Sequence, residues 1–209
     1  MFAIPIFPLP NVVLFPNVFL PLHIFEPRYR QMTAESLNGD RIIGMVLLRP
    51  GYEANYDGAP PVYATGCSGL ITHSEKLEDG RYNLVLRGIE KFAIDHEELP
   101  AAGRLYRSAV ITPINEPLAP GERDQLRQER KKLQNLLTPL FSGALDGRLS
   151  DNMADEDLVN ALAQYLEFDP MEKLALLERK GALALCRSMV ELLEMRAFQK
   201  DSPDSSTIH

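Results

Sequence analysis

Residues 15–32 read FPNVFLPLHIFEPRYRQM, and the nature of this stretch governs how the rest of the chain is interpreted. No charged side chain occurs from residue 1 through residue 25, and then Glu26, Arg28 and Arg30 follow within five residues. Such a pattern fits a membrane or export segment, a catalytic cluster, or the buried edge of a soluble fold.

Proline spacing argues against a membrane helix. Five prolines interrupt the first 25 residues: Pro5, Pro8, Pro10, Pro16 and Pro21. Each would remove a backbone hydrogen bond from a spanning helix, at a cost of roughly 3 kcal/mol. An export signal would begin with basic residues and end at a small-residue cleavage site, and neither accompanies the apolar run. We therefore expect no membrane contact and no export.

Composition points to a soluble globular protein. The 209 residues are 45% apolar and 24% charged, which is ordinary for a folded domain. The net charge of −7 disfavours binding to nucleic-acid phosphates. Cys67 and Cys186 lie too far apart in sequence for a CxxC metal site or a disulfide framework. This cysteine usage predicts a cytoplasmic location.

Residues 1–117 predict a β-rich subdomain. Strands are expected over residues 12–15, 18–25, 41–48, 62–77, 81–88, 91–98 and 104–114, a spacing typical of a closed or nearly closed barrel. Gly66 and Gly69 indicate a bulge or bend in the long strand, and Asp79-Gly80 a tight hairpin turn. Glu26-Pro27 predicts the start of a short helix with Tyr29 facing inward.

Residues 118–200 predict an α-helical subdomain, followed by a frayed polar tail over 201–209. A first helix opened by Pro120 carries an apolar stripe comprising Leu126, Leu133, Leu137, Leu140 and Phe141. Residues 142–152 are expected to form a loop, and the spacing of Leu158, Leu162, Tyr165 and Leu166 marks a second helix. Asp169-Pro170 and Glu172 predict a capped third helix. Lys180-Gly181 then separates it from a last helix over 182–199. The fold class is therefore α+β.

No arrangement of side chains supports a catalytic or metal site. The histidines His23, His73, His96 and His209 lack metal-ligand spacing, so neither a metal nor a cofactor is expected. His23 lies inside an apolar strand and is interpreted as a packed or hydrogen-bonded residue, with a functional role as the alternative. The GCSG stretch at 66–69 would need glycine at position 70 to form a nucleophile elbow, and Leu70 stands there. A nucleophilic Cys67 or Ser68 is therefore disfavoured.

Three stretches together resemble the N-terminal substrate-binding domain of Lon protease. They are IPIFPLPNVVLFPNVFLPLHIFEPRYRQM at 4–32, YATGCSGLITHSEKLEDGRYNLVLRGIEKFAI at 63–94, and LVNALAQYLEFDPMEKLALLE at 158–178. The form of the first stretch looks like that of stand-alone Lon-domain proteins that lack the ATPase and protease domains. The resemblance implies a PUA-like twisted β-barrel or pseudobarrel with a short helix, followed by a helical bundle.

The resemblance also implies binding of unfolded or exposed apolar polypeptide segments without hydrolysis, as an adaptor or accessory in protein quality control. A separate ATP-dependent protease is a further candidate partner. The candidate binding residues are Phe19, Leu22, Phe25, Glu26, Arg28, Tyr29, Tyr63 and Arg87. For each of them the alternative is a place in the core. Two other function classes stay open: a PUA-like module that binds a small ligand or RNA, and a hydrolase acting alone.

Overall fold

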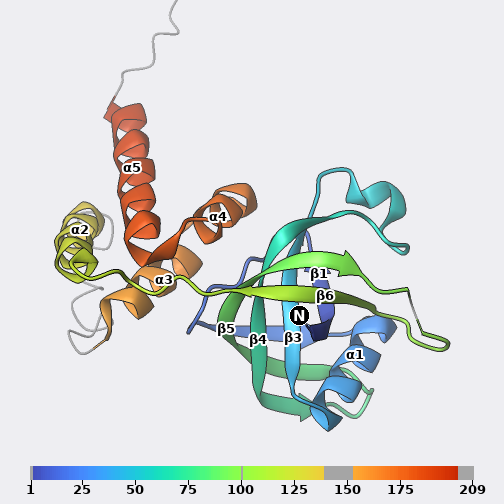
Figure 1. Cartoon of the computed structure of the whole chain (residues 1–209). Helices are drawn as coiled ribbons and strands as arrows, with labels where there is room; N and C mark the ends of the chain where they lie inside the picture. The colour runs from blue at the N-terminus through green and yellow to red at the C-terminus, as the bar shows by residue number, and fades with distance from the viewer. Residues whose placement is uncertain (1, 100, 139–152, 202–209) are drawn as a thin grey trace, which may run out of the picture. The chain divides into compact units, whose positions relative to one another are not determined.

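The chain forms two compact units in the computed structural model, which describes residues 2–99, 101–138 and 153–201 (Figure 1). The first unit contains the chain up to Asn115 together with Asn160–Glu178, and the second contains Glu116–Val159 together with the chain from Arg179 onward. A helical segment thus belongs to the β-rich unit. The division at residue 117 and the tail over 201–209 stay predictions from the sequence.

The first unit is built on an irregular ring of strands. Its strands are β1 Phe2–Leu9, β2 Phe19–Ile24, β3 Ile42–Leu48, β4 Val62–Lys76, β5 Tyr82–Glu97 and β6 Arg107–Ile114. The order is β2-β5-β4-β3-β1-β6, and β6 also pairs with β5, so that five strands close on themselves and β2 extends the sheet beside β5. Only β1 and β3 are parallel among the described pairs. The predicted α+β class with a barrel-like β part is confirmed.

Glycines allow the ring to curve where side chains would collide. The pairing of β4 with β5 shifts register between Ser68 and Gly69, as the glycine spacing predicted. A Cβ atom at Gly88 of β5 would lie 2.0 Å from the carbonyl oxygen of Phe15. The segment Val12–Phe15 is no strand, contrary to the prediction. It crosses close to β5, and Val13, Leu14 and Phe15 are buried without strand pairing.

Helix α1, Pro27–Asn38, covers part of the sheet (Figure 1). Pro27 occupies its first turn, as predicted from the Glu26-Pro27 pair. Tyr29 and Met32 enter the main core cluster, which they share with residues of the sheet such as Leu84 and Leu86. A second cluster around Ile6, Phe92 and Ile111 fills another part of the ring.

The remaining helices are η1 Tyr52–Asn55, α2 Glu122–Leu137, α3 Asp155–Tyr165, α4 Pro170–Leu177 and α5 Gly181–Asp201. The predicted capping box at α4 is present, since the Asp169 side chain accepts from the Glu172 amide and the Glu172 carboxylate accepts from the Asp169 amide. Helix α2 begins after Gly121, whose φ is +89°, and not at Pro120. Leu140, Phe141 and the predicted loop 142–152 lie outside the described residues.

The second unit packs α2 against α5. Leu126, Leu133 and Leu137 of the predicted stripe are buried. Arg130 of α2 forms an ion pair with Asp155 at the start of α3. The break at Lys180-Gly181 is confirmed, because α5 begins at Gly181 with a φ of +77°.

Candidate functional site

The side chains of β2 alternate between the core and the outer surface of the first unit. Leu22 packs against the main core cluster, whereas Phe19 is 51% exposed. The residue directly opposite Phe19 on β5 is Arg87, which is also exposed. Directly opposed residues of antiparallel strands present their side chains on the same face. The structure therefore brings Phe19 and Arg87 together and places Leu22 toward the core.

A tyrosine from α3 joins Phe19. The Tyr165 hydroxyl donates a 2.9 Å hydrogen bond to the Phe19 carbonyl oxygen, and the Tyr165 side chain is 66% exposed. One residue earlier, Gln164 Oε1 accepts from the Phe15 amide at 3.1 Å. Tyr165, one of the residues that marked the predicted second helix, ends α3 with its side chain on the surface. A tyrosine hydroxyl needs a polar partner, and this requirement could have indicated from the sequence that Tyr165 lies at the surface. Apolar periodicity alone does not take it into account.

Phe25 is a further exposed aromatic residue at the far end of β2, six positions after Phe19 and roughly 20 Å from it along the strand. It is 60% exposed, and its ring lies 6.3 Å from the His23 imidazole with 27° between the two planes. His23 Nδ1 lies 2.8 Å from Asn83 Oδ1 on the surface, so His23 is hydrogen-bonded, one of the two roles predicted for it. We use the term β2 surface for Phe19, Phe25, Arg87 and Tyr165.

The outer edge of β2 is protected against pairing with another strand. Within the described residues β2 pairs only with β5, and the Val18 carbonyl accepts from the Gly88 amide. Because hydrogen-bonding direction alternates along a strand, the backbone groups of Phe19, Pro21 and His23 point to the free edge. Pro21 has no N–H to donate, and the Phe19 carbonyl is occupied by Tyr165. This edge therefore disfavours strand addition.

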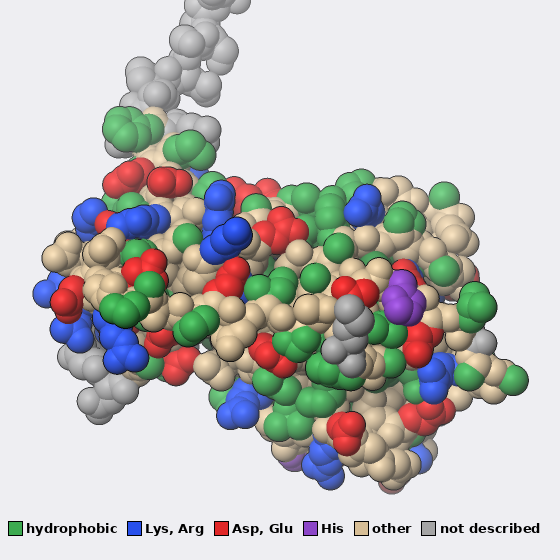
Figure 2. Space-filling model, in the orientation of Figure 1, with side chains coloured by type: hydrophobic (Ala, Val, Ile, Leu, Met, Phe, Trp, Pro, Cys, Tyr) green, Lys and Arg blue, Asp and Glu red, His purple; other side chains and the backbone are tan. Residues whose placement is uncertain are grey.

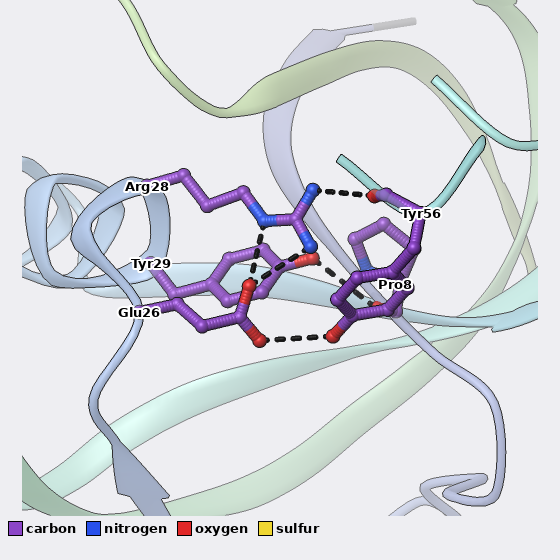
Figure 3. A network of polar contacts seen from close by, with 5 residues as sticks. All are labelled: Pro8, Glu26, Arg28, Tyr29 and Tyr56. Carbon is purple, nitrogen blue, oxygen red and sulfur yellow. Dashed lines mark hydrogen bonds and ion pairs between the residues drawn. The ribbon is translucent and has the colours of Figure 1, made fainter. Parts of the chain in front are cut away.

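Glu26, Arg28 and Tyr56 form a closed polar network at the start of α1 (Figure 3). Arg28 Nε donates to Glu26 Oε2 at 2.9 Å, and the Tyr56 hydroxyl donates to Glu26 Oε1 at 2.9 Å. Arg28 Nη1 donates to the Tyr56 carbonyl at 2.9 Å. The guanidinium carbon lies 4.7 Å from the ring centroids of both Tyr29 and Tyr56. Glu26 and Arg28 thus fasten the loop after η1 to α1.

Tyr29 belongs to the core. It is 4% exposed, its ring lies 4.3 Å from that of Phe7, and its hydroxyl donates to the Pro8 carbonyl at 3.4 Å (Figure 3). Burial raises the pKa of the Tyr29 phenol well above its usual range. Burial, and then the hydrogen bond to Glu26, also raises the pKa of Tyr56. Both phenols are therefore neutral at physiological pH.

Tyr63 lies apart from the β2 surface in strand register. It stands seven positions before Leu70, the β4 residue that pairs with Arg87. That separation corresponds to roughly 23 Å along a strand. Arg49 stacks on the Tyr63 ring at 5.2 Å and donates through Nε to the Val62 carbonyl at 3.0 Å. The structure does not bring Tyr63 to Phe19.

Neither Cys67 nor Ser68 is accessible as the nucleophile that a hydrolase would need. Both side chains are buried in β4, and Ser68 Oγ donates to the Glu90 carbonyl at 3.2 Å. Burial raises the pKa of the Cys67 thiol far above its ordinary value, so the thiolate does not form near neutral pH. The described part of the chain also contains no group of three or more His, Cys, Asp or Glu residues placed to hold a metal ion.

Charge on the surface is mixed. Figure 2 shows Lys and Arg side chains interspersed with Asp and Glu across the face in view, with apolar side chains between them. Nucleic-acid binding depends on several cations converging on a phosphate backbone.

Among the described residues, no helix is both long enough and apolar enough to span a bilayer.

These features define a class of α+β protein. In this class a proline-containing strand extends a five-strand ring, and a short helix covers part of it. Residues 3–195 match the family model described as the ATP-dependent protease La (LON) substrate-binding domain. The chain belongs to this family.

Relatives and solved structures agree with the assignment. Lon protease 2 of Myxococcus xanthus is 26% identical over 201 residues, covering 93% of this chain and 24% of that protein. Lon protease 1 of Bdellovibrio bacteriovorus is 23% identical over 226 residues, covering 96% and 26%. The chain thus spans about a quarter of the length of these relatives.

Two solved structures share the fold. The N-terminal domain of a Mycobacterium avium complex Lon protease superimposes with a TM-score of 0.72 at 13% identity, over 92% of this chain and 98% of that one. A Lon N-terminal domain protein from Xanthomonas campestris gives a TM-score of 0.62 at 22% identity, over 93% and 98%. The predicted resemblance to the Lon substrate-binding domain is confirmed.

Proposed function

We propose that this chain binds unfolded polypeptide segments that expose apolar side chains, and that it does so without hydrolysing them. Membership of a substrate-binding family supports a role in binding substrate. The observation that carries the proposal is the pair of exposed aromatic residues Phe19 and Tyr165 beside Arg87, with Phe25 exposed further along the same strand. Exposed aromatic side chains next to a cation are typical of protein-binding surfaces.

Binding through side chains fits the β2 surface better than strand addition does. Pro21 and the Tyr165–Phe19 hydrogen bond remove a donor and an acceptor from the free edge, so an added strand would lack partners there. Phe19, Phe25 and Arg87 are retained as the contacts of the proposal. Glu26 and Arg28 support it indirectly, because they hold α1 and the following loop in place. Leu22 and Tyr29 contribute to the core beneath the surface.

The cellular role belongs to the same proposal. We infer an accessory function in protein quality control, in which the chain delivers or sequesters clients and a separate ATP-dependent protease is the partner. The two free, buried cysteines support a cytoplasmic location. The mixed charge of the surface favours polypeptide over nucleic acid as the ligand.

A titration with an unfolded client tests the proposal. Fluorescence anisotropy of labelled casein should give saturable binding to the protein, and Phe19→Ala should weaken it roughly tenfold, the loss of one interface anchor. Leu99→Ala is the matched control, because it removes an exposed apolar side chain elsewhere in the first unit. No binding at high micromolar concentration, or equal affinity in Phe19→Ala and Leu99→Ala, would refute the proposal.

A further inference from the structure

A shallow hollow lies between α1 and the hairpin that joins β4 to β5. It has a volume of about 340 Å³ and is lined by Pro27, Arg30, Gln31, Lys76, Gly80 and Tyr82. Figure 1 shows α1 beside this end of the β4–β5 hairpin. None of the residues that form the β2 surface lines the hollow.

The charged side chains that line the hollow are both cations. Arg30 and Lys76 have no ion pair or hydrogen bond to a carboxylate among the described residues. The acidic residue of the hairpin turn, Asp79, is bonded to Arg81 at 2.6 Å, and Arg30 is the smallest of the electrostatic influences on its carboxylate. The lining of the hollow thus carries two positive charges and no acidic residue, whereas the chain as a whole has a net charge of −7.

The walls of the hollow are held by contacts within the fold. A Cβ atom at Gly80 would lie 2.2 Å from Arg30 Nη2, so the guanidinium rests against the turn backbone, where the φ of Gly80 is +80°. Gln31 is fixed by two hydrogen bonds, from its Nε2 to the Gly103 carbonyl at 3.0 Å and from the Leu105 amide to its Oε1 at 2.8 Å. Lys76 Nζ lies 5.9 Å from the centre of the Tyr82 ring.

We propose that this hollow binds an anionic group, a carboxylate or a phosphate, between Arg30 and Lys76. A guanidinium offers a planar fork of donors and an ammonium offers a compact charge, and both suit oxygens that carry negative charge. The open, cation-lined form suits a charged group better than an apolar one. Two sources share this chemistry: the carboxylate of a polypeptide, and free phosphate. No residue of the β2 surface lines the hollow, so the proposed site goes beyond the proposed function.

Isothermal titration calorimetry at low ionic strength distinguishes the two sources. The probes are inorganic phosphate and an N-acetylated, apolar ten-residue peptide prepared with either a free C-terminal carboxylate or a C-terminal amide. The variant that removes the site is Arg30→Gln with Lys76→Gln. The control is Arg123→Gln with Lys131→Gln, which removes the same charge from exposed positions of α2. Thermal unfolding of all proteins confirms that each is folded.

We expect phosphate, or the carboxylate peptide in preference to the amide peptide, to bind saturably. Loss of two charge-assisted contacts should weaken that binding on the order of 100-fold in Arg30→Gln/Lys76→Gln. The control should change it less than about twofold, because distant exposed charges act only through screened fields. Equal weakening in both double variants, or no preference for either anion, overturns the proposal. Binding of the amide peptide with no anion preference would overturn the anion site and leave the proposed polypeptide binding intact.

Discussion

The Tyr165 hydroxyl donates to the backbone carbonyl of Phe19, a residue 146 positions earlier in the chain. Through this bond a helix that follows the whole β ring occupies one of the acceptors on the free edge of β2. Pro21 lies on the same edge and has no backbone N–H, so the edge lacks the donor that any other residue would supply at this position. Pro21 and Tyr165, which are far apart in the sequence, therefore protect the same edge.

Restoring the edge should promote self-association. In Pro21→Thr/Tyr165→Phe the edge gains an N–H and frees a carbonyl, so we expect concentration-dependent oligomers by size-exclusion chromatography with light scattering. Tyr165→Phe alone serves as the control, because it leaves the missing donor of Pro21 in place and should stay closer to the parent protein. An oligomeric state that is the same in all three proteins would contradict this role of the edge.

Gly88→Ala should destabilise the first unit. The added methyl group would lie 2.0 Å from the Phe15 carbonyl oxygen, which is backbone and cannot rotate away. We expect a loss of about 3 kcal/mol in the free energy of unfolding, measured with urea, at the upper end of overpacking costs. Gly39→Ala is the control, since its nearest neighbour would lie at 3.7 Å and its φ is −113°. Similar losses in the two variants would argue against the close crossing.

Arg28→Ala should loosen the loop after η1. The change removes the ion pair with Glu26, the bond to the Tyr56 carbonyl and two ring contacts in one step. We expect a loss of about 2 kcal/mol in stability and faster proteolytic cleavage within residues 52–58. In the control, Arg81→Ala, the exposed pair with Asp79 is lost, which should change stability much less because solvent screens that pair. Unchanged cleavage in Arg28→Ala would show that the loop is held by other contacts.

Alkaline pH should destabilise the protein through Tyr106. Burial, followed by the 2.5 Å hydrogen bond to Glu35, raises the pKa of Tyr106 to about 12, against about 10 in an unfolded chain. A raised pKa means that the folded state holds the proton more tightly, so its stabilising effect is complete below pH ~10 and is lost as the pH rises toward ~12. Urea unfolding at a series of pH values between 9 and 12 measures this slope.

Two variants separate Tyr106 from the other tyrosines. Tyr106→Phe removes the ionisable group and should flatten part of the slope. Glu35→Gln keeps the phenol but removes the carboxylate that opposes its ionisation, so the fall should begin at the same pH and end earlier. If the slope is identical in Tyr106→Phe and the parent protein, groups other than Tyr106 cause the loss of stability at alkaline pH.

Local signals in the sequence predicted local structure well. Glu26-Pro27 marked the start of α1, Asp79-Gly80 the β4–β5 turn, and Asp169 with Glu172 the cap of α4, because each depends on a few neighbouring backbone groups. Residues 81–88 and 91–98 were predicted as two strands but form the single strand β5. Nothing local distinguishes a long curved strand from two short ones.

The candidate site was harder to predict, because exposure depends on tertiary neighbours. Phe19 and Leu22 are both apolar residues of one strand, and only the pairing with β5 decides which of them faces outward. Tyr165 matched the helical period of its buried neighbours Leu162 and Leu166, yet its hydroxyl is directed to the Phe19 carbonyl. Val12–Phe15 has the composition of a strand, but the crossing over Gly88 gives it another way to bury its side chains.

Helix α1 is held at two places, its start and its middle, by loops that are distant in sequence. Arg28 and Glu26 bind Tyr56 from one loop, while Gln31 and Glu35 bind the segment at 103–106. Neither loop can therefore leave the surface without releasing contacts to the same twelve-residue helix. In hydrogen exchange, the amides of the two loops and of α1 should report a single opening event, with one shared free energy, and so make up one cooperative unit of the native state.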